Sequence, residues 1–181
     1  MLALIHSQFR KFVISKYGLS FWESVNSDIH LSTDESSQTK NLKLIGIVNK
    51  TVEKTNVSLE LTLSNFGDYI SKTVIFSCNE QINKNWKTMD LLEHSDLIID
   101  YVMKKYLPFE IMQPKIGINR VSRDKLEFTY NTDTTFSHLG REIVRGLATY
   151  YGEEQSILIN VNLKKNGSST MRVKLKKNKI I

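Results

Sequence analysis

Apolar side chains recur about every third or fourth residue through the first part of the chain, which is the spacing of helices with one buried face. The pattern predicts helices at about 2–16, 20–25, 41–54, 58–74 and 88–106. Gly18 is expected to end the first helix, Ser20 to cap the second, and Asn56 or Ser58 to cap the fourth. The polar residues 31–40 predict an exposed connection, and 79–85 predict a polar loop.

The pattern changes after Pro114. Residues 115–121 and 125–130 alternate apolar and polar, which predicts two strands joined by a turn at 122–124. Helical spacing returns over 136–151, with Gly152 as its stop. Residues 157–163 and 171–175 alternate again and are joined by a turn at 166–168.

These elements predict an α+β fold in which a helical lobe precedes an antiparallel sheet, with one long helix between its two hairpins. The length of 181 residues suits one domain. We expect a helical lobe over about 1–60 and a distal lobe, holding the long helix and the sheet, over about 61–181.

The net charge of +6 is concentrated at the end of the chain, where no acidic residue follows Glu154. A basic hairpin could contact the phosphates of nucleic acid or of an anionic membrane. No aromatic residues are interleaved for base stacking, so we favour a solvated hairpin whose lysines protect the sheet edge, and expect no specific nucleic acid. No apolar run is long enough for a transmembrane segment and the N-terminus lacks the features of a signal peptide, which predicts a cytoplasmic protein.

The sequence carries no recognisable catalytic motif. Its glycines are scattered, its histidines are far apart, and no nucleophile stands on a characteristic turn. One cysteine, Cys78, cannot form an internal disulfide or a zinc site. We therefore expect a protein that is not an enzyme.

Several stretches, in this order, resemble the haem–nitric oxide/oxygen binding (H-NOX, HNOB) family. They are Met1–Trp22, Asn65–Tyr69, Gln113–Ile116, Leu126–Tyr130 and Ile143–Leu147. The resemblance covers nearly the whole chain. It implies the H-NOX fold and a signalling role as a sensor domain for gases such as nitric oxide.

The resemblance also implies a histidine that binds the haem iron from the helix predicted at 88–106. Counting back from Tyr106 places this ligand at Ile99, and counting back from Pro114 places it at Tyr101. Isoleucine cannot bind iron, whereas tyrosinate can and favours ferric iron. His94 is five residues before Ile99, about 140° away around a continuous helix. Metal ligation is therefore not expected, unless His94 or Tyr101 binds haem.

The family also binds the two haem carboxylates through a Tyr-x-Ser-x-Arg motif. The matching run here keeps Tyr130, has Thr132 for the serine and has Thr134 in place of the arginine. Arginine matters because its planar fork binds a carboxylate through two hydrogen bonds. Arg141 or Arg145, on the following helix, are the candidates to compensate.

We therefore expect a sensor or regulatory ligand-binding module with a degenerate haem site and no cofactor. It would act through a signalling partner protein and could bind a small apolar ligand. Two alternatives remain open: a haem-binding gas or redox sensor with an unusual ligand, and a basic protein that binds nucleic acid or anionic membrane. Without haem, larger side chains would fill the space, and the candidates are Phe9, Phe66, Phe76, Met103 and Met112.

Overall fold

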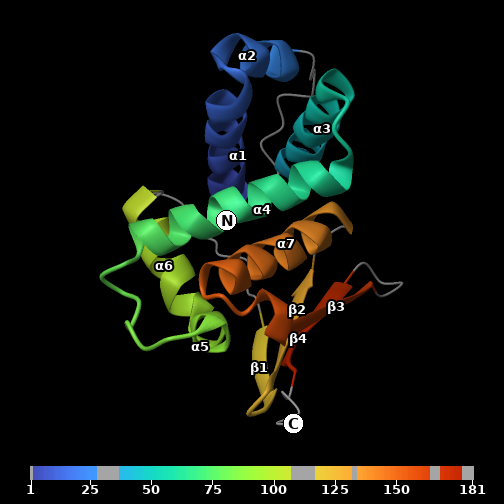
Figure 1. Ribbon diagram of the computed structural model, residues 1–181. Helices are drawn as coiled ribbons and strands as arrows, with labels where there is room; N and C mark the ends of the chain where they lie inside the picture. The colour runs from blue at the N-terminus through green and yellow to red at the C-terminus, as the bar shows by residue number, and fades with distance from the viewer. Residues whose placement is uncertain (1, 28–36, 107–116, 132–133, 164–167, 177–181) are drawn as a thin grey trace. The chain divides into compact units, whose positions relative to one another are not determined.

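The computed structural model describes residues 2–27, 37–106, 117–131, 134–163 and 168–176 (Figure 1). Its helices are α1 (Leu2–Tyr17), α2 (Leu19–Ser27), α3 (Ser37–Thr55), α4 (Leu59–Ser77), α5 (Thr88–Glu93), α6 (Ser95–Tyr106) and α7 (Thr134–Tyr150). Its strands are β1 (Gly117–Ser122), β2 (Lys125–Asn131), β3 (Ile157–Leu163) and β4 (Ser168–Leu175), and a 3-10 turn, η1 (Glu154–Ser156), precedes β3. This α+β order is the one that the sequence predicts.

The chain forms two compact units, Met1–Phe66 and Gly67–Ile181, whose boundary falls inside α4. The first unit contains α1 to α3 and the beginning of α4. Its interior is aromatic: the ring of Phe66 lies 4.9 Å from that of Phe9, nearly perpendicular to it, and 5.5 Å from that of Phe12. All three side chains are buried, so these rings form the core of the helical unit.

The ends of the first helices differ in part from the prediction. Gly18 ends α1 as expected, with a positive φ of 91° that glycine adopts without strain. The predicted cap at Ser20 is wrong, because α2 already begins at Leu19. Residues 37–40, predicted as part of an exposed connection, are the first turn of α3. Residues 28–36 lie outside the described residues.

The beginning of α4 decides between the two predicted caps. The amide of Leu61 donates to the hydroxyl of Ser58 at 3.2 Å, so Ser58 is the cap. Asn56 instead has a positive φ of 54°, in the turn after α3.

The helix predicted over 88–106 is two helices. α5 ends at Glu93, His94 leaves the helical conformation with ψ of 17°, and α6 begins at Ser95. The prediction of one continuous helix is therefore wrong. The angular separation of His94 from Ile99, calculated for an unbroken helix, does not apply.

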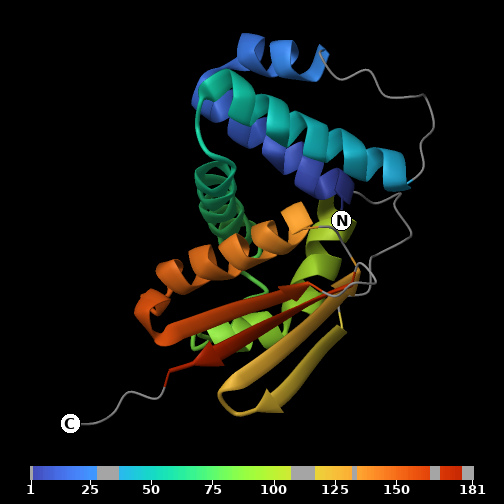
Figure 2. The same cartoon turned by 90° about the vertical axis from the view of Figure 1, so that its right-hand side faces the viewer.

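The second unit contains a four-stranded antiparallel sheet in the order β1-β2-β4-β3. Leu126 and Phe128 on β2 pair with Val173 and Met171 on β4, and all four are buried. Their alternating neighbours, such as Arg172 and Lys174, are exposed on the outer face. The long helix α7 packs on the covered face (Figure 2) and contacts β3 and β4. The sheet thus has one core face and one solvent face.

Candidate functional site

Helix α6 carries the position expected for the iron ligand. Among its described side chains, Ile98 and Val102 are buried, at 5% and 6% exposure, and they lie one turn apart. Ile99 and Tyr101 flank this buried stripe and are half-buried. The hydroxyl of Tyr101 accepts a long hydrogen bond of 3.5 Å from the ammonium of Lys105, which lies 5.4 Å from the centre of the Tyr101 ring. Ile99 offers no atom that could coordinate a metal.

His94 lies at the break between α5 and α6, where its ring is held by two contacts. Its Nδ1 lies 2.8 Å from the backbone oxygen of Asp90, and its ring stacks on Trp86 with centres 4.5 Å apart. A carbonyl oxygen can only accept, so Nδ1 carries the proton and the neutral ring has its lone pair at Nε2. His94 is therefore an oriented imidazole in a turn, and neither contact can be predicted from the residue spacing.

The residues of the predicted carboxylate-binding motif fall on other elements. Tyr130 is on β2, opposite Ser169 of β4, and Thr134 is the first residue of α7. Pro114 and Thr132 lie outside the described residues. The structure therefore places the candidate residues Ile99 and Tyr101 on α6 and the motif residues at the β2–α7 junction.

The two arginines that could compensate for Thr134 are paired with a buried acid. Glu142 on α7 is 3% exposed. One of its oxygens accepts a 2.8 Å hydrogen bond from Nε of Arg141, and the other lies 3.6 Å from the guanidinium of Arg145. Arg145 also reaches Glu154, at 3.7 Å. Both guanidinium groups thus already have carboxylate partners within the protein, which disfavours a role for either in binding a haem carboxylate.

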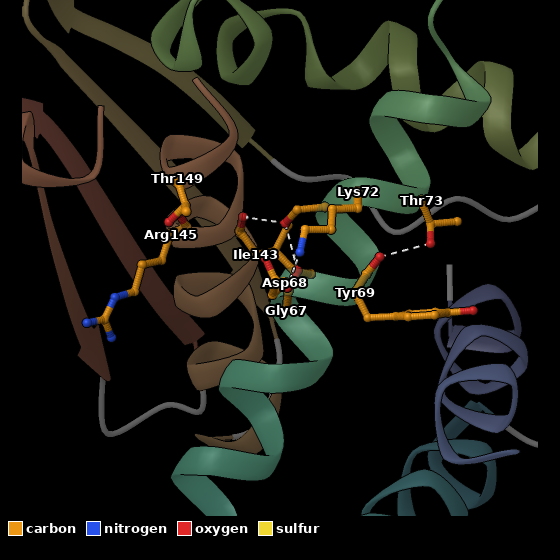
Figure 3. A network of polar contacts seen from close by, with 9 residues as sticks. Gly67, Asp68, Tyr69, Lys72, Thr73, Ile143, Arg145 and Thr149 are labelled. Atoms are coloured by element: carbon orange, nitrogen blue, oxygen red, sulfur yellow. Dashed lines mark hydrogen bonds and ion pairs between the residues drawn. The ribbon is translucent and has the colours of Figure 1, made fainter. Parts of the chain in front are cut away.

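Helices α4 and α7 approach each other closely in the second unit (Figure 3). The hydroxyl of Ser71 lies 2.7 Å from the carbonyl oxygen of Gly67 and 2.9 Å from that of Ile143, so its single proton is shared between the two helices. A Cβ atom on Gly67 would lie 2.6 Å from the backbone carbon of Glu142, and one on Gly146 would lie 2.5 Å from the Ser71 oxygen. Glycine is required at both positions by this packing. The resemblance includes both glycines, but the sequence gives no sign that they meet opposite helices.

A two-pronged ion pair connects α5 to β1. Arg120 donates from Nε and from one terminal nitrogen to the two carboxylate oxygens of Glu93, at 2.7 and 2.5 Å. Arg120 pairs with buried Leu126 and therefore points to the covered face of the sheet. The hydrogen bond from Arg120 lowers the pKa of Glu93, and Coulombic attraction lowers it further, whereas burial acts in the opposite direction. α5 is thereby fixed at the β1 side of the covered face.

His6, in the first unit, has a perturbed pKa. Burial lowers its pKa, and the nearby cations Lys43 and Arg10 lower it further. Its ring lies 5.8 Å from that of Trp22, edge to face, and its Nε2 is buried without a hydrogen-bond partner among the described residues. His6 thus favours its neutral form and lies half-buried against Trp22.

The described residues contain no group of three or more His, Cys, Asp or Glu side chains that could hold a metal ion. Within the same residues no helix is both long and apolar enough to cross a bilayer.

Solved structures with the same architecture are H-NOX proteins. The chain superposes on the Fe(II) unliganded H-NOX protein of K. algicida with a TM-score of 0.70 at 15% identity, over 100% of both chains. It superposes on the Fe(II)NO form of an S. oneidensis H-NOX protein with a TM-score of 0.70 at 14% identity, over 98% of this chain and 100% of the other. A mutant H-NOX protein of T. tengcongensis gives 0.70 at 16%, over 98% of each. At these identities the likeness establishes the fold.

The family follows from the sequence itself. The profile of the Haem-NO-binding family matches residues 2–159, so the chain belongs to this family. No curated protein shows a significant sequence match to this chain. Domains of this family are sensor modules rather than enzymes, which confirms the predicted class of sensor or ligand-binding module.

Proposed function

We propose that this protein is a sensor or regulatory module of its family that does not hold haem through a proximal histidine. The observation that carries the proposal is Ile99. It occupies the ligand position counted from Tyr106, on the helix where the family's histidine is expected, and its side chain cannot bind iron. Counting from Pro114 places the ligand at Tyr101 instead, and the hydroxyl of Tyr101 lies 3.5 Å from the ammonium of Lys105.

The second support comes from a different element. Thr134 stands where the family has an arginine, and the nearby Arg141 and Arg145 are engaged by Glu142. A haem carboxylate would have to compete with a buried carboxylate for these guanidinium groups. The iron-ligand position and the arginine position lie on different elements and both lack the required side chain. Aligning α6 differently with the family would therefore not restore the haem site. The residues present do not fit a conventional haem.

The phenylalanine cluster of the first unit supports a collapsed or differently filled interior. A cavity costs on the order of 24 cal/mol per Å³, so the volume that a haem would take must be occupied. Phe9 and Phe66, two of the predicted filling residues, are 0% and 1% exposed. Phe76 is 87% exposed, so its predicted role in filling the interior is wrong. Met112 lies outside the described residues, and the side chain of Met103 is likewise not described. A small apolar ligand would bind beside this aromatic cluster.

One alternative is kept, because the geometry of His94 favours it. Its Nδ1 proton is directed to Asp90, which leaves Nε2 as a lone-pair donor of the kind that binds ferrous iron. A haem held by His94, or by Tyr101 in the ferric state, would make the protein a gas or redox sensor with an unusual ligand.

The proposed module has no catalytic step, acts through a partner protein and resides in the cytoplasm. Support for that location is the single cysteine, which can form no internal disulfide.

The proposal is tested by titrating the purified protein with haemin and recording the Soret band in the ferric and the dithionite-reduced states. His94→Ala and Tyr101→Phe are the matched variants, because each removes one candidate ligand and leaves the other. We expect no stoichiometric Soret band in the wild type. A stoichiometric band that is lost in one of these variants overturns the proposal and identifies that residue as the ligand.

A further inference from the structure

The strand β3 forms one edge of the sheet and has no strand on its outer side within the part of the chain that the structure describes. All seven of its residues pair with β4 from Ile157↔Leu175 to Leu163↔Ser169 without a shift of register. Its sequence, ILINVNL, has no charged residue and no proline. Leu158 and Leu163 are 44% and 51% exposed. β3 is therefore a straight, uncharged edge of the kind that pairs with other strands.

Hydrogen-bond directions show which groups of β3 face outward. The amide of Lys176 donates to the carbonyl oxygen of Ser156 at 2.7 Å, which makes Ser156 and Lys176 a hydrogen-bonded pair. Bonding alternates along an antiparallel pair, so Leu158, Asn160 and Asn162 also bond to β4. The backbone groups directed to the open edge are those of the alternate residues, Ile157, Ile159, Val161 and Leu163. β3 thus presents a regular ladder of donors and acceptors.

The opposite edge of the same sheet is protected. β1 has a register shift between Arg120 and Ser122, where Val121 bulges out of the pairing. Arg120 of the same strand is held by Glu93 of α5. Bulges and charges are the devices by which sheets avoid pairing with other chains. β3 has neither, so the two edges differ in their readiness to accept a strand. The predicted protection of this edge by lysines is not found among the described residues, because Lys174 lies on the inner strand β4.

The solvent face of the sheet beside β3 is positively charged. Lys125 and Lys174 are directly opposite each other on β2 and β4, and neither forms an ion pair with a described residue. Arg172 on β4 is bonded to Glu127 at 2.6 Å, so this ion pair adds no net charge and the lysines make the face positive. Like charges placed opposite each other are unfavourable, and an acidic neighbour relieves the repulsion.

From these observations we infer that β3 is a docking edge for an extended, acidic segment of a partner protein, which adds to the sheet as a fifth strand. The backbone of the segment would bond to the outward groups of β3, and its apolar side chains would cover the half-buried Ile159 and Val161. Its acidic side chains would lie on the outer face, near Lys174. A second copy of this chain is the poorer occupant, because two chains of net charge +6 repel each other. The inference depends on the sheet alone, so its failure leaves the haem question unchanged.

The test is binding of a fluorescein-labelled peptide in which valine and threonine alternate between glutamates at both ends, followed by fluorescence anisotropy. Val161→Pro removes an outward amide without breaking a bond to β4, and Val121→Pro, which places a proline at the bulge of the other edge strand, is the comparison. We expect saturable binding to the wild type and to Val121→Pro. Binding to Val161→Pro should be weaker by about tenfold or more. Circular dichroism of both variants checks that each is folded.

A second matched pair keeps the test decisive if the proline variants unfold. Asn160 and Asn119 are exposed on the same face and in the same cross-strand row, at opposite edges of the sheet. Asn160→Asp should weaken binding of the acidic peptide, and Asn119→Asp should not. Equal effects of the paired variants, no saturable binding, or equal binding of a peptide with lysines in place of the glutamates each overturn the inference. A wild-type dimer in sedimentation that Val161→Pro abolishes also overturns it, and assigns the edge to a second copy.

Discussion

Gly146 is the residue at which the close approach of α7 to α4 can be tested most sharply. Replacing it with alanine adds one methyl group in the middle of a helix, where alanine is intrinsically favoured over glycine by about 1 kcal/mol. On helix propensity alone, Gly146→Ala stabilises the protein. The packing of the second unit predicts the opposite sign, so the direction of the change is informative by itself.

The size of the effect follows from the distances around Gly146. The added Cβ would lie 2.5 Å from the Ser71 oxygen, 3.0 Å from the Ser71 Cβ and 3.1 Å from the backbone oxygen of Gly67. The Ser71 hydroxyl could rotate away only by abandoning its contacts with Gly67 and Ile143. Overpacking of this kind costs about 1–3 kcal/mol, and contact with backbone places it at the upper end. After the gain in helix propensity, we expect a net loss of about 2 kcal/mol in the free energy of unfolding.

The assay is urea denaturation followed by circular dichroism. Thr149→Ala is the control on the same helix, because Thr149 is exposed and its replacement should change the stability by less than about 0.5 kcal/mol. Ser71→Ala removes the nearest atom to the added methyl group. It should therefore cost less in the Gly146→Ala background than in the wild type, with a coupling energy of about 1 kcal/mol. A Gly146→Ala protein as stable as the wild type, or more stable, would refute the close approach.

Three further predictions concern single side chains. The hydrogen bond from Arg120 lowers the pKa of Glu93 in the folded protein below its unfolded value of about 4.5. The Glu93 carboxylate therefore stabilises the protein at pH values above about 4.5, and this stabilisation is lost as the pH falls through the pKa of the folded protein. Urea titrations should show that Glu93→Gln costs about 0.5–1 kcal/mol at pH 7 and flattens the loss of stability in acid. Burial lowers the pKa of His6 in the folded protein, so the unfolded chain binds a proton first as the pH falls below about 6.5, and the free energy of unfolding declines there. His6→Gln should remove this decline. An unchanged dependence of the free energy of unfolding on pH in this variant would contradict the assignment. Burial raises the pKa of the Cys78 thiol, which is 0% exposed. A thiol reagent at pH 8 should therefore react slowly with the native protein and completely with the protein unfolded in urea. Rapid reaction with the native protein would count against a buried thiol.

The order of helices and strands could be predicted because their apolar periods are strong. The break at His94 could not, because Leu91 and Ile98, buried on either side of it, are seven residues apart. Seven residues are two helical turns, so the apolar period runs through the break without interruption. The start of α3 was missed for a related reason: residues 37–40 are all polar and carry no apolar period.

The candidate site could be predicted only as far as residue identity decides it. That Ile99 and Thr134 lack the required chemistry is visible in the sequence. That Arg141 and Arg145 are paired with Glu142 is not, because helical spacing does not say which side chain is buried with which partner. Phe76 shows the same limit. It follows buried Ile75 in α4 but is 87% exposed, and an aromatic side chain does not by itself show which of two neighbouring helix positions faces the interior.

The central claim, that the fold is kept without histidine-ligated haem, is tested most directly by comparing haemin titrations of the wild type and of Ile99→His. The substitution supplies an imidazole at the position where the family's ligand is expected. The account predicts no stoichiometric Soret band in the wild type, and only weak, non-stoichiometric binding of haemin by Ile99→His, because Thr134 and the buried Phe9 and Phe66 still disfavour haem. A stoichiometric, saturable band in the wild-type protein would contradict it.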